Sequence, residues 1–198
     1  LTDNASNDGT AEILRKIAME DSKVKVIIRS KNIGAPRNIY AALEFAKGEA
    51  IIPMLPADLQ DPADLIPDLY REWKKGFSIV YGVRKNRQES FLLRTGRTLY
   101  YKIIHKFSEA TIVTNAGEFM LIDKRILHSI LDVKDENPFI RGLVAQSGAK
   151  FSTIPYTWTK RDTGKSKATP LVLIDQAING LVSTSRIPAR LALLFGFG

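Results

Sequence analysis

Short apolar runs alternate with stretches of helical periodicity along most of the chain. Thr10–Glu20 and Ala35–Lys47 each carry apolar side chains on one face, which predicts two amphipathic helices, the second ended by Gly48. Asp61 followed by Pro62 is typical of an N-cap and first helical residue, so we expect a helix from there to about Lys75. A further helix is expected over Ser90–Lys106. The predicted strands are Val24–Ile28, Ala50–Leu55, Ser78–Tyr81 and Phe119–Ile122.

Strands that alternate with helices predict an α/β fold built from βαβ units around a mostly parallel sheet. The chain begins on Leu1-Thr2, which has the character of a strand end running into a polar loop, so we expect an earlier strand to be missing. At 198 residues, with 44% apolar and 25% charged side chains, one domain is expected, over residues 1–185. Residues 186–198 are treated separately.

The composition restricts the chemistry of any metal site. The chain has no cysteine and two histidines, His105 and His128, each inside an apolar helical pattern. A histidine in that setting is more often a structural residue than a ligand. A bound metal would therefore be held by oxygen ligands, which favours Mg²⁺ or Mn²⁺ over zinc.

The net charge of +8 is concentrated in two segments. Arg84–Lys106 carries seven Lys and Arg side chains against one acid, and the chain from Lys160 onward carries six against two. Such patches attract nucleic acid, anionic membrane or phosphorylated small substrates, and charge alone does not choose among them. No apolar run approaches the roughly 20 residues of a membrane span. The tail, Ile187–Gly198, is apolar beside Arg186 and Arg190, so it is either an interfacial segment leading to a membrane region or a helix packed on the chain's own core.

Three polar loops follow predicted strands, where α/β sheets bind their ligands. These loops are Asp3–Thr10, Lys31–Gly34 and Pro56–Asp61. In chain order the first motifs are Thr2-Asp3-Asn4-Ala5-Ser6-Asn7-Asp8-Gly9-Thr10, Arg29 with Asn32-x-Gly34, Ala46-x-Gly48, and Ala57-Asp58-Leu59-Gln60-Asp61-Pro62. The later motifs are Tyr81-Gly82-x-Arg84, Gly117-Glu118-Phe119-x-Leu121, Arg141-Gly142, and Arg161-x-x-Gly164-x-Ser166-Lys167.

In order and spacing these motifs resemble the family 2 glycosyltransferases, and most closely the polyprenyl-phosphate and dolichol-phosphate sugar transferases, which include dolichol-phosphate mannosyltransferase-like enzymes. The resemblance covers nearly the whole chain. It implies a GT-A, Rossmann-like fold that binds a nucleotide-sugar. It also implies that Asp58 and Gln60 bind a divalent cation, Mg²⁺ or Mn²⁺, on the donor diphosphate, and that Asp3 contacts the base. The other donor-binding candidates are Arg29, Arg161 and Lys167.

Alternatives remain for several of these residues. Asp58 could be a turn or helix-capping aspartate and Gln60 a solvated loop residue, while Asp3 and Asp8 could serve in Asx turns, the role we favour for Asp8. Pro56 stands where the family usually has the first aspartate of Asp-x-Asp. Fewer anionic ligands predict weaker metal binding, so either the diphosphate and waters complete the shell or the enzyme is slow or inactive.

On the acceptor side, the resemblance implies that Arg84 holds a lipid phosphate, with Arg94 and Arg97 as further candidates. Arginine suits phosphate through its paired N–H donors. A solvated basic helix face is the alternative for the last two. Glu118 is the candidate catalytic carboxylate: a hydroxyl acceptor would need it as a base, whereas a phosphate monoester, with a second pKa of about 6, would not.

The sequence therefore predicts a metal-dependent, inverting family 2 hexosyltransferase that uses a UDP-, GDP- or dTDP-sugar and a polyprenyl or dolichyl phosphate. It would act at the cytoplasmic face of a membrane in cell-envelope glycan synthesis. A homo-oligomer is one expected form, and nucleic acid is not an expected partner. The alternative is a degenerate GT-A domain, or a basic αβ module, that binds nucleotide, membrane or nucleic acid without catalysis. Salt-sensitive nucleic-acid binding that ignores manganese would favour that alternative.

Overall fold

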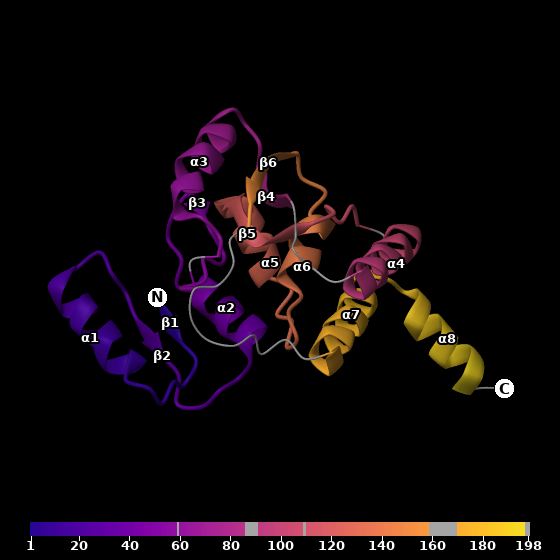
Figure 1. Ribbon diagram of the computed structural model, residues 1–198, viewed down its shortest axis with the longest axis horizontal. Coiled ribbons are helices and arrows are strands. Elements are labelled where there is room, and N and C mark those ends of the chain that lie inside the picture. Colours follow the sequence, from indigo (N-terminus) through magenta and orange to yellow (C-terminus); the bar gives the residue numbers. More distant parts are fainter. Residues whose placement is uncertain (59, 86–90, 109, 159–169, 197–198) are drawn as a thin grey trace.

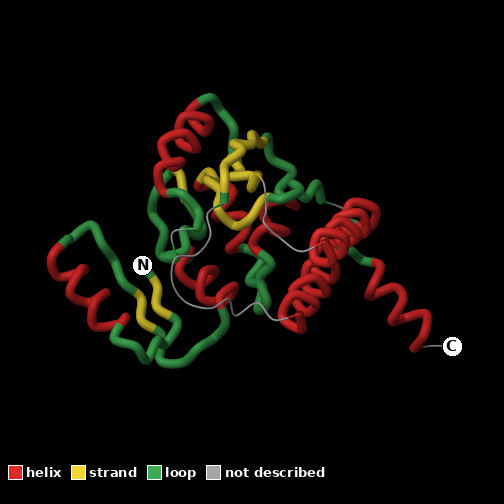
Figure 2. Tube along the Cα trace, in the orientation of Figure 1, coloured by secondary structure: helices red, strands yellow, loops and turns green. Residues whose placement is uncertain are grey.

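The computed structural model describes residues 1–58, 60–85, 91–108, 110–158 and 170–196. Within these ranges it is an α/β structure with one small and one larger sheet (Figures 1 and 2). The helices are α1 (Thr10–Glu20), α2 (Ala35–Leu43), α3 (Ile66–Lys74), α4 (Phe91–Phe107), α5 (Lys124–Leu131), α6 (Ile140–Gln146), α7 (Pro170–Thr184) and α8 (Ile187–Gly196), with a 3₁₀ turn, η1, at Ala63–Leu65.

The strands form two sheets. Strands β1 (Thr2–Asp3) and β2 (Ile27–Ile28) make a two-stranded parallel sheet. The larger sheet has the order β3-β5-β4-β6, and its members are β3 (Ala50–Ile51), β4 (Ile79–Lys85), β5 (Ala116–Asp123) and β6 (Phe151–Thr157). Strand β5 runs antiparallel to β3 and β4, and β6 runs parallel to β4.

The expected α/β class is confirmed, but the larger sheet is mixed and not mostly parallel. The reason lies in α4, which connects β4 to β5. Instead of crossing a face of the sheet, α4 packs against α6 and α7 through Tyr101 and Ile104. The chain consequently enters β5 at the end of the sheet where it left β4, and Arg84 donates its backbone N–H to the Asn115 carbonyl at 3.2 Å.

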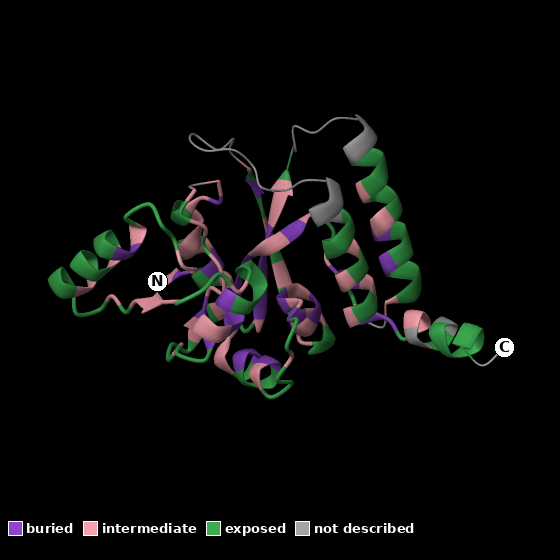
Figure 3. Cartoon of the chain, turned by 90° about the horizontal axis from the view of Figure 1, so that it is seen from below, coloured by how far each residue is buried: buried purple, intermediate pink, exposed green. Residues whose placement is uncertain are grey.

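Both faces of the larger sheet are covered. Ile79, Tyr81, Met120 and Ile122 face α2, α5 and α6, whereas Val80, Phe119 and Leu121 face α3. Neighbouring residues in β4 and β5 thus point to opposite faces, as strand geometry requires. Figure 3 shows the buried residues concentrated around this sheet, with α4 and α7 side by side and α8 at the C-terminal end of the described chain.

The predicted helices were placed well, whereas the strands were not. Helix α1 has the expected bounds, and α4 covers the described part of the predicted basic helix. Helix α3 ends one residue before Lys75 but begins at Ile66 and not at Pro62, because Ala63–Leu65 forms a 3₁₀ turn. Helix α2 ends at Leu43, before Lys47, because the next amides of Phe45 and Ala46 bond three residues back as turns. The first two predicted strands shorten to two residues each, and the last two extend to Lys85 and over Ala116–Asp123.

Strand β6 was not predicted. Its sequence, with Pro155 and three Ser or Thr residues, lacks an apolar run of strand length. The strand pairs with β4 alone and forms an edge of the sheet, where a proline without an N–H is tolerated.

The C-terminal helices carry exposed apolar side chains. Ile174, Ile178 and Val182 form one row on α7, and Leu194 and Phe195 on α8 are 71% and 84% exposed. Among the helices that the structure describes, none is both long and apolar enough to span a bilayer. The interfacial role of residues 186–198 and the boundary at residue 185 stay predictions.

Candidate active site

The candidate site lies at the end of the larger sheet where strands β4 and β6 finish and strand β5 starts. Because β5 is antiparallel to β4, Gly117 and Glu118 at its start lie beside Arg84 near the end of β4. A β-bulge at Gly82 shifts the register just before Arg84. A Cβ at Gly82 would lie 2.9 Å from Phe119, so the glycine of the Tyr81-Gly82-x-Arg84 motif allows close strand packing.

The loop predicted to bind the metal follows β3. Asp58 and Gln60 are both half-buried, and the Asp58 carboxylate accepts the Gln60 backbone N–H at 3.2 Å, which makes an Asx turn. The turn alternative for Asp58 is therefore present in the structure, although it does not exclude a metal role, since a carboxylate has several acceptor positions.

The donor set of this loop fits a hard cation. Asp58 offers carboxylate oxygens and Gln60 an amide oxygen, and within the described ranges no group of three or more His, Asp or Glu side chains could hold a metal ion. Mg²⁺ is typically bound by one or two carboxylates together with substrate phosphates and waters. With Pro56 in the loop, Asp58 and Gln60 would hold Mg²⁺ or Mn²⁺ only with such help.

A buried ion pair joins the end of this loop to the sheet. Asp61 is 3% exposed, and both of its carboxylate oxygens accept from Arg84 Nη2 at 3.1 Å. Tyr156 on β6 donates its hydroxyl to the same carboxylate and accepts from Arg84 Nε at 3.0 Å. Burial, and then the bond to Asp61, raise the pKa of Tyr156 to about 12. The predicted N-cap role of Asp61 is wrong, because its side chain turns to Arg84 and the following turn starts with no side-chain cap.

The Arg84 guanidinium is enclosed on two further sides. It lies over the Trp158 ring at 4.9 Å from the centroid. A Cβ at Gly117 would come within 3.1 Å of Arg84 Nη2, so the glycine lets the guanidinium pack closely on β5. Much of the hydrogen-bonding capacity of Arg84 is therefore used within the protein, and contact with an acceptor phosphate stays a prediction for this residue.

Glu118 is a partly buried carboxylate between two cations. Burial raises its pKa, and the charges of Arg141 and Arg84 partly oppose that rise. Arg141 Nη1 donates to the Ala116 carbonyl at 2.6 Å, and its buried Nε has no hydrogen-bond partner among the described residues. A Cβ at Gly142 would lie 2.4 Å from the Phe139 ring, which explains the glycine of the Arg141-Gly142 motif.

The first two polar loops form a separate group around β1 and β2. Asn4 donates to the Asn32 side chain at 2.8 Å and accepts the Ile33 backbone N–H at 3.0 Å. Asp3 is 4% exposed and accepts the Ser6 backbone N–H at 3.0 Å, three residues along the chain, so its side chain holds the loop without forming the two-residue Asx turn considered for it. The turn role of Asp8 is confirmed, because it accepts from the Thr10 amide and hydroxyl.

Arg29 lies beside these loops on the chain that follows β2. Its Nε donates weakly to Asn38 Oδ1 at 3.4 Å, and the same oxygen accepts the Thr2 hydroxyl at 2.8 Å. Its buried Nη2 has no partner among the described residues. A partly buried guanidinium with one buried, unpaired nitrogen is suited to an anionic or carbonyl group of a ligand, so donor binding stays the prediction for Arg29. Base contact stays a prediction for Asp3.

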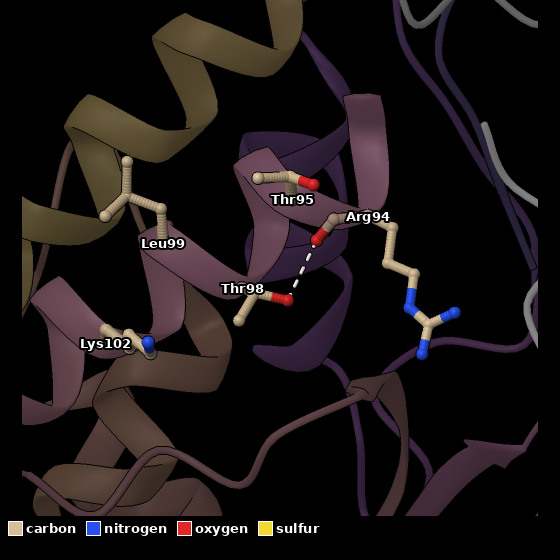
Figure 4. A pocket seen from close by; sticks show the side chains of 5 residues that line it. All are labelled: Arg94, Thr95, Thr98, Leu99 and Lys102. Atoms are coloured by element: carbon tan, nitrogen blue, oxygen red, sulfur yellow. Dashed lines mark hydrogen bonds between the residues drawn. The ribbon is translucent and has the colours of Figure 1, made fainter. Parts of the chain in front are cut away.

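The basic helix α4 separates two of the predicted acceptor residues. Arg97 is half-buried and donates to the Asn115 side chain, next to the start of β5. Arg94 is exposed and borders a hollow of about 590 Å³ whose described lining also includes Thr95, Thr98, Leu99 and Lys102. Figure 4 shows the Arg94 side chain pointing away from Leu99 and Lys102, so cationic groups lie on both sides of the drawn helix segment. Arg161 and Lys167 lie outside the described residues.

Sequence reasoning missed three residues of this site. Asp61 was predicted as a cap, Tyr156 belongs to the strand that was not predicted, and Arg141 was noted as a motif residue without a role. Asp61 and Arg141 could have been assigned to the site from the sequence, because both stand in the motifs quoted above. Nothing in the sequence marked Tyr156 as a site residue.

The sequence matches the description "Glycosyl transferase family 2" over residues 1–131. The chain belongs to this family. The uncharacterized glycosyltransferase YkcC of Bacillus subtilis (strain 168) is 32% identical over 194 residues, which are 98% of this chain and 60% of that protein. The prophage bactoprenol glucosyl transferase homolog of Escherichia coli (strain K12) is 30% identical over 194 residues, which are 98% and 63%. The chain thus spans about three fifths of the length of these relatives.

Solved structures show the same fold. The mannosyltransferase PcManGT from Pyrobaculum calidifontis, in complex with GDP-Man and Mn²⁺, has a TM-score of 0.51 at 17% identity and covers 100% of this chain and 65% of that one. TarS of S. aureus has a TM-score of 0.50 at 15% identity, with 79% and 50% covered. The expected family and the GT-A fold are confirmed, as is the similarity to polyprenyl-phosphate sugar transferases.

Proposed function

We propose that this chain is the catalytic domain of an inverting glycosyltransferase that moves a sugar from a nucleotide-sugar to a polyprenyl phosphate. One observation carries the proposal. Asp61, at the end of the metal loop, bonds Arg84, and Arg84 lies against Gly117, the residue before Glu118. The Asp58–Gln60 loop, Arg84 and Glu118 therefore meet at one end of the larger sheet. Donor-side and acceptor-side groups are thereby adjacent.

On the donor side, a nucleoside diphosphate gains negative charge as it leaves the sugar. Mg²⁺ or Mn²⁺, when bound, would supply Lewis-acid stabilisation of that charge. Asp58 and Gln60 would hold the cation, and Asp3 and Arg29 would bind the nucleotide from the neighbouring loops. Arg161 and Lys167 are proposed to contact the diphosphate, as the resemblance implies.

On the acceptor side, the names of several relatives support a lipid phosphate: bactoprenol glucosyl transferases of Shigella phages are 30% identical to this chain. A phosphate monoester needs cations and little base, since its second pKa is about 6. Arg94 at the hollow and Arg97 beside β5 would contribute charge, and Arg84 would contribute the N–H groups of Nη1.

Glu118 would act on the attacking oxygen. Inversion requires that oxygen to approach the anomeric carbon opposite the leaving diphosphate. A carboxylate whose pKa is raised by burial is a better base near neutral pH than an ordinary glutamate, so Glu118 would take the remaining proton of a monoanionic phosphate. With a dianionic phosphate it would orient Arg84 and Arg141 instead.

The proposed setting is the cytoplasmic face of a membrane. The exposed apolar side chains of α7 and α8, together with Arg186 and Arg190, would lie at the lipid surface. A homo-oligomer is compatible with this arrangement.

A second candidate is a GT-A domain that binds nucleotide or an anionic surface without catalysis. Pro56 favours it, because it replaces the usual first aspartate of the metal loop. Under this alternative, donor binding would persist without turnover, or binding to anions would be indifferent to Mn²⁺.

Transfer and hydrolysis assays with UDP-, GDP- and dTDP-sugars test the proposal. Each sugar is supplied with and without Mn²⁺ and with and without a polyprenyl phosphate. We expect Mn²⁺-dependent transfer from one donor, stimulated by the lipid phosphate. Failure to bind any of the three nucleotides would contradict the proposal, and binding without turnover would favour the second candidate.

A further inference from the structure

Asp61, Arg84 and Tyr156 form a buried cluster, which we call the Asp61 clamp. All three side chains come from different segments: the loop after β3, strand β4 and strand β6. Asp61 and Tyr156 are 3% and 6% exposed, and the hydrogen bonds from Arg84 measure 3.0 to 3.1 Å. A carboxylate that is removed from water and bonded by two donors has one orientation available.

The clamp fastens the far end of the loop that follows β3, whose start is held by Met54 packing on the core beneath the larger sheet. In the described part of Pro53–Asp61, no backbone–backbone hydrogen bond to the sheet is present. Inside the loop, the Gln60 backbone N–H bonds the Asp58 carboxylate and orients these two residues relative to each other. The side chain of Asp61, the residue directly after Gln60, supplies side-chain bonds to β4 and β6.

The surroundings of the clamp are shaped to keep Arg84 in place. Trp158 covers one face of the guanidinium, and Gly117 leaves room that any larger residue would fill. Trp158 and Gly117 thus restrict the guanidinium independently of its bonds to Asp61. Strands β4 and β6 act as a rigid base, because they pair over seven residues from Ile79 to Lys85.

We propose that Asp61 and Tyr156 are positioning residues that preset the Asp58–Gln60 loop for a divalent cation. This inference rests on the proposed function, because it needs Asp58 and Gln60 to be the ligands. If the loop had to become ordered when the cation binds, the entropy cost of that ordering would lower the affinity for the cation. A loop that is already ordered avoids this cost. The effect is expected to be large here, since Pro56 leaves the loop with one carboxylate ligand.

The test measures Mn²⁺ affinity directly, by electron paramagnetic resonance of free Mn²⁺, in separate titrations with UDP, GDP and dTDP. Asp61→Ala removes the clamp, Tyr156→Phe removes one of its bonds without changing charge, and Asp61→Asn keeps the shape. We expect Mn²⁺ affinity to fall about tenfold or more for Asp61→Ala and about threefold for Tyr156→Phe, with Asp61→Asn between wild type and alanine.

Matched controls lie away from the site. Tyr40 is a second buried tyrosine whose hydroxyl donates to a backbone carbonyl, that of Ile130 at 3.0 Å, and Asp123 is a largely buried aspartate at the opposite end of β5. Tyr40→Phe and Asp123→Asn should lower thermal stability without changing Mn²⁺ affinity. Comparable losses of affinity in these controls would show a general effect of stability and overturn the inference.

The outcomes distinguish failure of the proposed function from failure of the role assigned to the Asp61 clamp. A wild-type chain that binds no Mn²⁺ with any of the three nucleotides contradicts the proposed function itself. A wild-type chain that binds, with Tyr156→Phe and a folded Asp61 variant within 1.5-fold of it, leaves the function standing and overturns the role of the clamp. Tyr156→Phe decides the question if Asp61→Ala does not fold.

Discussion

Replacing Arg84 by methionine tests the energetics of the buried ion pair. The substitution keeps much of the side-chain volume but leaves the Asp61 carboxylate, whose side chain is 2% exposed, with Tyr156 as its remaining partner among the hydrogen bonds described above. Removing one member of a buried ion pair typically costs about 3–5 kcal/mol. For a domain of this size each kcal/mol lowers the melting temperature by about 2–4 °C, so we expect a fall of roughly 6–20 °C.

The assay is urea unfolding followed by circular dichroism, with a second variant that separates charge from shape. Asp61→Asn combined with Arg84→Met removes the unpaired charge, so the double variant should be more stable than Arg84→Met alone. Arg125→Met is the control, because Arg125 pairs with Asp123 while its own side chain is 82% exposed, and it should change stability little. The reasoning is refuted if Arg84→Met costs less than about 1 kcal/mol, or if the double variant recovers nothing.

Four further substitutions test the site. Asp58→Ala should weaken Mn²⁺-dependent nucleotide binding at least tenfold, about 1.4 kcal/mol, by calorimetry, and unchanged binding would show that the metal site is misplaced. Glu118→Gln tests the raised pKa, because the folded carboxyl holds its proton to higher pH than the unfolded one. The stability of the wild type should therefore fall as pH rises from about 4.5 through the raised pKa. Urea titrations at several pH values should show this fall in the wild type and not in the variant. Gly142→Ala places a Cβ 2.4 Å from Phe139 and should cost about 1–3 kcal/mol, and an unchanged urea midpoint would contradict that packing. Arg94→Ala should raise KM for a polyprenyl phosphate about tenfold with little change in kcat, whereas a fall in kcat alone would argue against phosphate binding.

The helices were predictable because local pattern determines them. Thr10–Glu20 has the spacing of an amphipathic helix, and its bounds were correct. Strand direction was not predictable, because an alternation of helices and strands does not reveal where each helix packs. Here α4 packs on α6 and α7, whereas α3 covers the sheet face. The edge strand at Phe151–Thr157 was missed because an exposed edge does not require an apolar run.

The candidate site was predictable to the level of its motifs. Asp58, Gln60, Arg84 and Glu118 were found by resemblance, and the structure places Arg84 and Glu118 at one edge. The partners within the site were not predictable. Asp61 follows the pattern of a helix cap, and only the tertiary structure shows that its carboxylate bonds an arginine 23 residues further along the chain.

The antiparallel course of β5 has a consequence for how such a domain can diversify. Adjacent strands of a sheet lie about 4.8 Å apart, so the spacing between the Arg84 strand and the Glu118 strand is a property of the sheet and does not depend on the segment between them. That segment, which contains α4 and the hollow at Arg94, leaves and re-enters the sheet at the same end. Under the proposed function, the acceptor preference can therefore change by exchange of the segment between β4 and β5, while the spacing of Arg84 and Glu118 stays the same.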